Sequence, residues 1–148
     1  MNSVLFACNL NSVRSPMAAA IARHYFGRRL QVDSAGVEAG YLDGFAIAVM
    51  NELGIDIAKY RPKTFDKLIE DEAEFDLVIS LSPEAHHRAL EFARDKSMEV
   101  EYWPTQDPTI ALELGLSREG VLHSYRAVRD ALSERILARL GQGPVGNL

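Results

Sequence analysis

The chain has 148 residues, 47% of them hydrophobic, and a formal net charge of -5 at pH 7. This length is typical of one domain with a buried core, so we expect a single domain over residues 1–148. The negative charge argues against nucleic acid as a partner, and no apolar run approaches the about 20 residues of a membrane span. The chain's one cysteine, Cys8, excludes an intrachain disulfide and a cysteine-rich zinc site. Because the first residues also lack the layout of a signal peptide, we expect a cytoplasmic protein.

The first half of the chain alternates apolar runs with helical patterns. A continuous apolar run at residues 4–7 predicts a strand that is buried on both faces. Ser15, followed by a proline, is typical of a helix N-cap, so a helix is expected over residues 17–26. A second strand is expected over residues 30–35, and a second helix over residues 45–53.

The second half of the chain continues this alternation. We expect an irregular segment over residues 55–64, a short helix over 65–73, a strand over 77–81 and a helix over 83–94. These are followed by a strand over 100–103, a loop over 104–117, a long helix over 118–140 and a flexible tail over 141–148. Because strands alternate with helices, the sequence predicts an α/β fold of three layers, a parallel sheet with helices on both faces.

Polar and charged residues follow the ends of the predicted strands. Cys8 comes directly after the first strand, and residues 38–41 follow the second. Ser82 and Asp107 follow the third and fourth strands. Ligands of such sheets bind at the carboxyl ends of the strands, near the point where the strand order reverses. We therefore expect these four loops to meet at one edge of the sheet.

The loop from Cys8 to Arg14 has the composition of an anion site. If it wraps onto the start of the next helix, its backbone N–H groups form a nest, and the helix dipole adds positive charge. Arg14 offers a planar pair of donors to an oxyanion. A Cys8 thiolate would be stabilised by the same field and placed for in-line attack on the central atom of a tetrahedral anion. Alternatively, Cys8 is a small buried hydrophobe, the usual role of a lone cysteine; the Cys-x5-Arg spacing favours the site.

Two further residues of this loop have both structural and functional interpretations. Ser15 caps the helix in either case, and in the functional interpretation its hydroxyl also hydrogen-bonds the thiolate. Asn11 is either a surface turn residue or the residue that holds a left-handed turn, because asparagine tolerates positive φ.

A carboxylic acid occurs in the segment YWPTQDPT, after the last predicted strand. When a thiolate displaces an alkoxide or phenoxide, the leaving oxygen needs a proton, which Asp107 could donate. The same carboxylate would later accept a proton from the hydrolytic water, and Pro108 would stiffen the loop. Alternatively, the Asp-Pro pair only marks a turn. The expected position of Asp107 at the same sheet edge as Cys8 and Arg14 favours the catalytic interpretation.

The order and spacing of these motifs resemble the low-molecular-weight protein tyrosine phosphatases and the arsenate reductases that share their fold. The resemblance extends over VLFACNLNSVRSPMAAA, VDSAGVEAG, AIAVMNELGIDI, FDLVISLS and YWPTQDPT. It implies a four-stranded parallel sheet, for which we expect the order 2-1-3-4, in one phosphatase-like domain that uses no metal and no organic cofactor.

The resemblance also implies roles for individual residues. Cys8 corresponds to the nucleophile, Arg14 to the phosphate clamp and Asp107 to the general acid. Asn11 and Ser15 correspond to residues that organise the loop. The whole phosphate-binding loop then comprises Asn9, Leu10, Asn11, Ser12, Val13, Arg14 and Ser15.

The sequence departs from the family pattern Cys-x-Gly-Asn-x-Cys-Arg-Ser at several positions. Leu10 stands in place of the glycine, and Val13 in place of the second cysteine, which excludes a protective disulfide with the nucleophile. Thr109 and Ile110 stand where the tyrosine phosphatases often have tyrosines. Tyr41, in the loop after the second strand, is either an aromatic wall that sets specificity or a surface tyrosine.

Three functions are compatible with these residues. The first is a cysteine-dependent phosphatase that hydrolyses phosphomonoesters, protein phosphotyrosine included, through a phosphocysteine. The second is an arsenate reductase, which would need an external low-molecular-weight thiol because the chain has no other cysteine. The third, suggested by Leu10 in the loop, is a catalytically weak oxyanion-binding module. The expected partners are a phosphorylated protein or a small phosphomonoester, and phosphate or another oxyanion, with no nucleic acid and no membrane.

Overall fold

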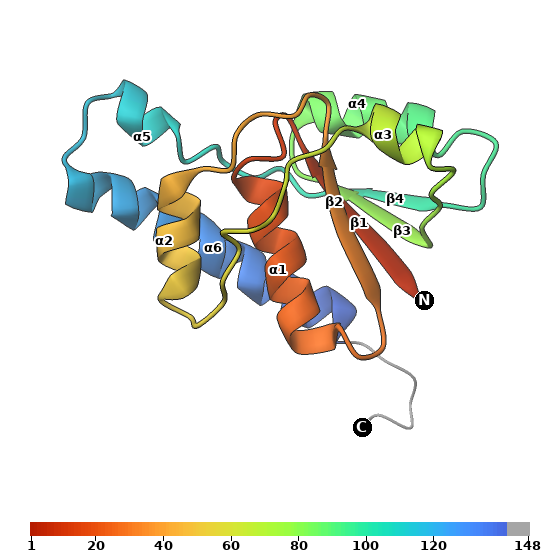
Figure 1. The fold of residues 1–148 in the computed structure, drawn as a ribbon, viewed down its shortest axis with the longest axis horizontal. Coiled ribbons are helices and arrows are strands. Elements are labelled where there is room, and N and C mark those ends of the chain that lie inside the picture. Colours follow the sequence, from red (N-terminus) through yellow and green to blue (C-terminus); the bar gives the residue numbers. More distant parts are fainter. Residues whose placement is uncertain (142–148) are drawn as a thin grey trace.

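The computed structural model describes residues 1–141, so residues 142–148 of the predicted tail lie outside the described residues. Its four strands form one parallel sheet in the order β2-β1-β3-β4 (Figure 1). The strands are β1 (Ser3–Cys8), β2 (Gln31–Gly36), β3 (Leu77–Ser80) and β4 (Glu99–Tyr102). The predicted α/β class, the number of strands and their order are confirmed.

The helices also follow the predicted pattern, with one exception. They are α1 (Arg14–Phe26), α2 (Gly44–Asn51), α3 (Phe65–Glu70), α4 (Pro83–Phe92), α5 (Ile110–Glu113) and α6 (Arg118–Leu140). The prediction of a loop over residues 104–117 was wrong where α5 forms. Asp107 accepts hydrogen bonds from Thr109 just before α5, and Ala111 is buried, so a local turn and the packing of Ala111 stabilise this short helix. Within residues 1–141, no helix has the length and apolar character needed to cross a membrane.

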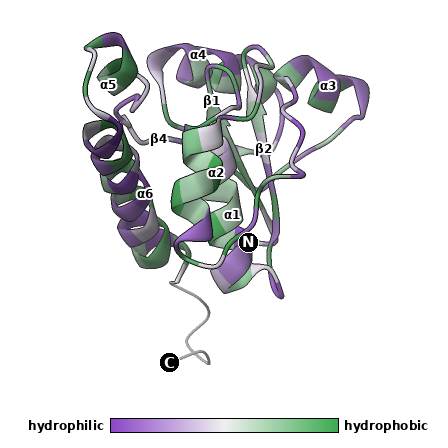
Figure 2. Cartoon of the chain, turned by 60° about the vertical axis from the view of Figure 1, so that its left-hand side comes forward, coloured by the Kyte–Doolittle hydropathy of each residue, from purple (hydrophilic) through white to green (hydrophobic). Residues whose placement is uncertain are grey.

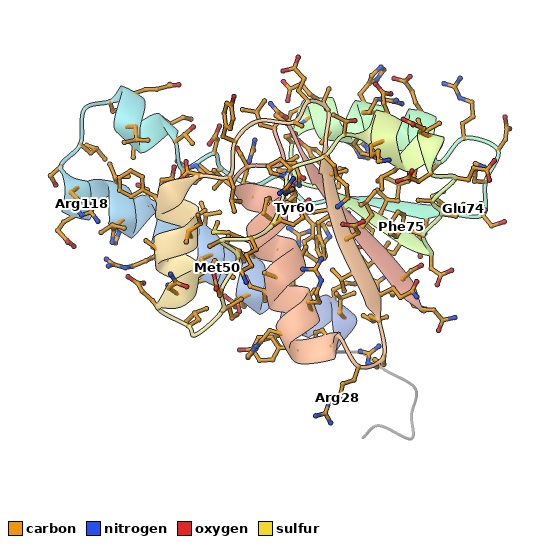
Figure 3. All side chains as sticks on the ribbon, in the orientation of Figure 1. Arg28, Met50, Tyr60, Glu74, Phe75 and Arg118 are labelled. Atoms are coloured by element: carbon orange, nitrogen blue, oxygen red, sulfur yellow. The ribbon has the colours of Figure 1, made fainter. Side chains whose placement is uncertain are left out.

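The side chains of β1 alternate between two hydrophobic cores. Val4 and Phe6 pack with α1, α2 and α6, whereas Leu5 and Ala7 pack with α3 and α4. Met50 of α2, labelled in Figure 3, is fully buried in the first of these cores. Because successive side chains of a strand point to opposite faces, β1 is covered on both sides, which confirms the predicted three layers.

The register of the strands brings their carboxyl ends to one edge. Ala7 pairs with Ala35 on one side and with Ser80 on the other, and Ser80 pairs with Tyr102. The chain proceeds from β1 to β2 in one direction and from β3 to β4 in the other, so the strand order reverses between β1 and β3. Loops that follow β1 and β3 therefore diverge there and leave room for a ligand.

Candidate active site

The loop between β1 and α1 lines a cavity of about 380 Å³ at this edge of the sheet. One wall is formed by Cys8, Asn9, Leu10, Ser12, Val13 and Arg14. Asp107 and Thr109 line the same cavity from the loop after β4. The predicted juxtaposition of the cysteine loop and the Asp-Pro loop is therefore present, and the volume suits a small ligand.

The N-terminus of α1 differs from those of α2, α3, α4 and α6. The helices α2, α3, α4 and α6 begin with side chains that accept a hydrogen bond from a first-turn N–H, namely Asp43, Thr64, Ser82 and Ser117. By contrast, α1 begins after Val13 with no side-chain cap and no acidic residue in its first turn. The backbone N–H groups of residues 9–15 donate to no acceptor within residues 1–141. Uncapped N–H groups at a helix start favour an anion, so this loop offers an oxyanion site made of backbone.

Cys8 ends β1 with its sulfur beside the first turn of α1. The distance from Cys8 Sγ to Ser15 Oγ is 2.8 Å. The prediction that Ser15 is the N-cap was wrong: Val13 is the N-cap, because the chain already turns helical at Arg14. The Ser15 hydroxyl accepts a hydrogen bond from Asn11 Nδ2 at 2.8 Å, and the acceptors within reach of its own proton are the Cys8 sulfur at 2.8 Å and the Ala35 carbonyl at 3.4 Å. A negatively charged sulfur is the nearer and stronger acceptor of this proton. Although Cys8 is buried, it also lines the cavity, so its burial does not hide it from a ligand.

Asn11 links the loop to a distant segment of the chain. It is fully buried with φ of 53°, so the interpretation as a left-handed turn residue is correct. Its Nδ2 donates to Ser15 and Ser34, at 2.8 and 3.0 Å. Its Oδ1 accepts from the Tyr60 hydroxyl at 2.5 Å and from the Lys63 N–H at 2.9 Å. Tyr60 is labelled in Figure 3, beside α1 and β2. These bonds hold the carboxamide on both sides and therefore fix the loop.

Sequence reasoning did not find Tyr60 or Lys63. They are 49 and 52 residues from Asn11 and lie in a segment predicted only as irregular, so no local pattern marks them. Their contribution arises because the chain passes behind the loop. The N–H of Gly36 donates to the Lys63 carbonyl at 2.9 Å, which anchors this segment to the end of β2.

The loop closes without a glycine of its own. Leu10 is not among the residues with positive φ, and its side chain is 45% exposed at the mouth of the cavity. Instead, the loop backbone lies close to Gly36 of β2, where a Cβ atom would be 2.8 Å from the Asn11 nitrogen. The loop therefore needs one left-handed residue, Asn11, and a glycine on the neighbouring strand.

Arg14 connects the cysteine loop to the segment that carries the carboxylic acid. Its side chain is buried, and Nη1 donates to the Thr105 carbonyl at 2.9 Å. Two residues later, Asp107 Oδ1 accepts from the Thr109 N–H at 3.0 Å and from the Thr109 hydroxyl at 2.7 Å. The guanidinium and the carboxylate are thus both held beside the cavity by hydrogen bonds to one short segment.

Two acidic residues at the mouth had no predicted role, although one of them belongs to the loop at residues 38–41 that was expected at this edge. Glu38, in the loop after β2, and Glu84, in the first turn of α4, both line the cavity. The expectation that the loops after β2 and β3 reach this edge was the signal that could have identified them. Asn9 accepts a hydrogen bond from the Ser82 hydroxyl, which ties the cysteine loop to the start of α4. Tyr41 is 96% exposed and does not line the cavity, so its role as an aromatic wall stays a prediction.

The fold and the site together define a class of protein. In a parallel α/β sheet, the first strand ends in a thiol and is followed by free amides and a buried arginine, an arrangement suited to a tetrahedral oxyanion. In the described part of the chain, no group of three or more His, Cys, Asp or Glu side chains is placed to hold a metal ion. Comparison with protein families is more specific. Residues 3–141 match the family described as low molecular weight phosphotyrosine protein phosphatase, and the chain belongs to this family.

The chain is similar to arsenate reductases and to tyrosine phosphatases. An arsenate reductase of Halalkalibacterium halodurans is 33% identical over 133 residues, which is 90% of this chain and 91% of that protein. A solved arsenate reductase in the phosphate binding state is 30% identical, with a TM-score of 0.77 over 96% of this chain and 98% of that one. A solved low molecular weight protein tyrosine phosphatase from T. tengcongensis is 25% identical, with a TM-score of 0.76 over 97% of this chain and 100% of that one. The family is therefore shown, while its two activities are both represented among similar proteins.

Proposed function

We propose that the chain is a cysteine-dependent phosphatase that hydrolyses phosphomonoesters, protein phosphotyrosine among them. The observation that supports this proposal is the single thiol, Cys8, in a cavity that Asp107 also lines. Hydrolysis of a phosphomonoester by this route needs one nucleophile and one acid, and no second thiol.

The proposed reaction has two steps. In the first, the Cys8 thiolate attacks phosphorus, the bond from phosphorus to the ester oxygen breaks, and Asp107 gives that oxygen its proton. The N–H groups of residues 9–15 and the Arg14 guanidinium stabilise the charge on the other phosphate oxygens. In the second step, water attacks phosphorus, Asp107 accepts its proton, and the sulfur leaves as a thiolate to which Ser15 donates a hydrogen bond.

A second candidate, arsenate reduction, is favoured by the arsenate reductases among the similar sequences. Cys8 would bond to arsenic(V) in the same loop with loss of water. An external low-molecular-weight thiol would then attack the Cys8 sulfur, which releases arsenite and leaves a mixed disulfide, so that two thiols supply the two electrons. A second external thiol would free Cys8. The external thiol is required because the chain has one cysteine.

One preparation separates these activities. An aryl phosphate, an alkyl phosphate and arsenate with added thiol are each supplied as substrate, and the Cys8→Ser variant serves as the control. The phosphatase proposal predicts hydrolysis of the phosphate esters that Cys8→Ser abolishes, and accumulation of phosphoenzyme in Asp107→Asn. Thiol-dependent arsenate turnover without ester hydrolysis supports the second candidate instead. Phosphate binding without either turnover identifies an oxyanion-binding module, and wild-type hydrolysis by Cys8→Ser rules out the phosphocysteine route.

A further inference from the structure

A second cavity of about 250 Å³ adjoins the candidate active site. It lies between the loop after β4, the short helix α5 and the first half of α6. We call it the α5 groove, and its apolar lining comes from Ile110, Leu114, Leu116 and Val128. Asp107 lines both the α5 groove and the cavity of the cysteine loop. The two cavities are therefore neighbours that share the carboxylic acid as a common wall.

The α5 groove is bordered by apolar side chains that water contacts. The exposed fractions of Leu114 and Leu116 are 71% and 47%, and that of Ile110 is 42%. Hydrophobic colouring on α5, at the edge of the molecule, is visible in Figure 2. Such a concentration of exposed apolar side chains beside a polar site is typical of a surface that binds another molecule.

The helix that borders the groove is linked to the Asp107 carboxylate by Thr109. Thr109 immediately precedes α5 and donates two hydrogen bonds to Asp107, from its N–H and its hydroxyl. Among the helices and strands, α5 has its main packing against α6, where Ala111 is buried. A ligand group that fills the groove would hold α5 in place and, through Thr109, the position of Asp107.

We propose that the α5 groove binds an apolar side chain of a phosphorylated polypeptide while the loop at residues 9–15 holds its phosphate. This inference rests on the proposed phosphatase function. A small phosphomonoester fills only the first cavity, whereas a ligand that fills both needs a phosphate and an apolar group joined by a linker that passes Asp107. Glu38 and Glu84 line the first cavity and repel acidic side chains next to the phosphate. The leucine and isoleucine side chains that line the α5 groove favour an apolar side chain there.

Matched phosphotyrosine peptides test this inference. Each peptide carries one leucine at one of the three positions on either side of the phosphotyrosine, and its partner carries glutamine there. Because leucine and glutamine are both uncharged, repulsion by Glu38 and Glu84 affects the two peptides equally. At one position, we expect the leucine peptide to exceed the glutamine peptide about tenfold in kcat/KM. Because the groove also positions Asp107, part of the gain is expected in kcat and not only in KM.

The variant Leu114→Gln is expected to remove most of this preference and to leave the hydrolysis of a small aryl phosphate unchanged. Leu137→Gln, at a 42% exposed leucine of α6 away from the groove, is the matched control and should retain the preference. If Leu114→Gln does not fold, Leu116→Gln takes its place.

The outcomes separate this inference from the proposed function. Hydrolysis of the aryl phosphate without preference for leucine at any position overturns the groove and leaves the phosphatase function standing. Equal losses of aryl phosphate and peptide hydrolysis in Leu114→Gln also overturn it, because they indicate a structural role of α5. Absence of hydrolysis of any phosphate ester overturns the proposed function, and the groove inference with it.

Discussion

Replacement of Asn11 by glycine tests whether the buried carboxamide fixes the cysteine loop. The change removes four hydrogen bonds, to Ser15, Ser34, Tyr60 and Lys63, but permits the φ of 53°. At about 1 kcal/mol of net stability for each bond, the free energy of unfolding should fall by about 3–5 kcal/mol. Asn11→Ala should lose about 1 kcal/mol more, because a β-carbon disfavours the left-handed conformation.

The assay is urea denaturation of each variant, with the slope against urea compared to confirm that only stability changes. Phosphate binding, measured by calorimetry on the folded variants, should weaken because the N–H groups of residues 9–15 lose their fixed arrangement. Asn2→Gly, at an exposed asparagine, is the matched control for the cost of a new glycine. A loss below about 1 kcal/mol in Asn11→Gly would contradict the reasoning, because the network would then contribute no more than one hydrogen bond.

Three further predictions concern the clamp, the acid and the surface. Arg14→Lys should weaken phosphate binding about 10- to 100-fold, because lysine lacks the planar pair of donors, and unchanged affinity in calorimetry would contradict this. Thr109→Val removes the hydroxyl that donates to Asp107, so kcat for an aryl phosphate should fall about 3- to 10-fold with phosphate binding unchanged; equal weakening of both would argue against it. A hydrogen bond from Arg126, the largest cause, lowers the pKa of Glu52 from 4.5 to about 2, so this group stabilises the fold above about pH 4.5 and its contribution is lost as the pH falls toward 2. The stability difference between the wild type and Glu52→Gln should therefore shrink between about pH 5 and pH 2 in urea titrations, and a constant difference would refute the linkage.

The order of the strands and helices was predictable because the signals that specify them are local. Apolar runs predicted β1 and β3, and the pattern of long helices placed α1 and α6 to within a few residues. The short helix α5 was missed because its four residues are stabilised mainly by packing against α6, which buries Ala111, and this contact exists only in the tertiary structure. The position of the candidate site was predictable for a similar reason. Parallel strands bring their carboxyl ends to one edge of the sheet, so the loops that follow them meet there.

The sequence by itself determined the parallel sheet, the spacing of Cys8 and Arg14, and the left-handed turn that Asn11 is suited to hold. Only the tertiary structure decided that Ser15 lies inside α1 against the sulfur, that Tyr60 supports the loop from behind, and which residues complete the cavity. The physical reason is the range of the forces. Helix periodicity and turn preferences act over a few residues, whereas a hydrogen bond between residues about fifty positions apart exists only once the sheet and its helices have packed.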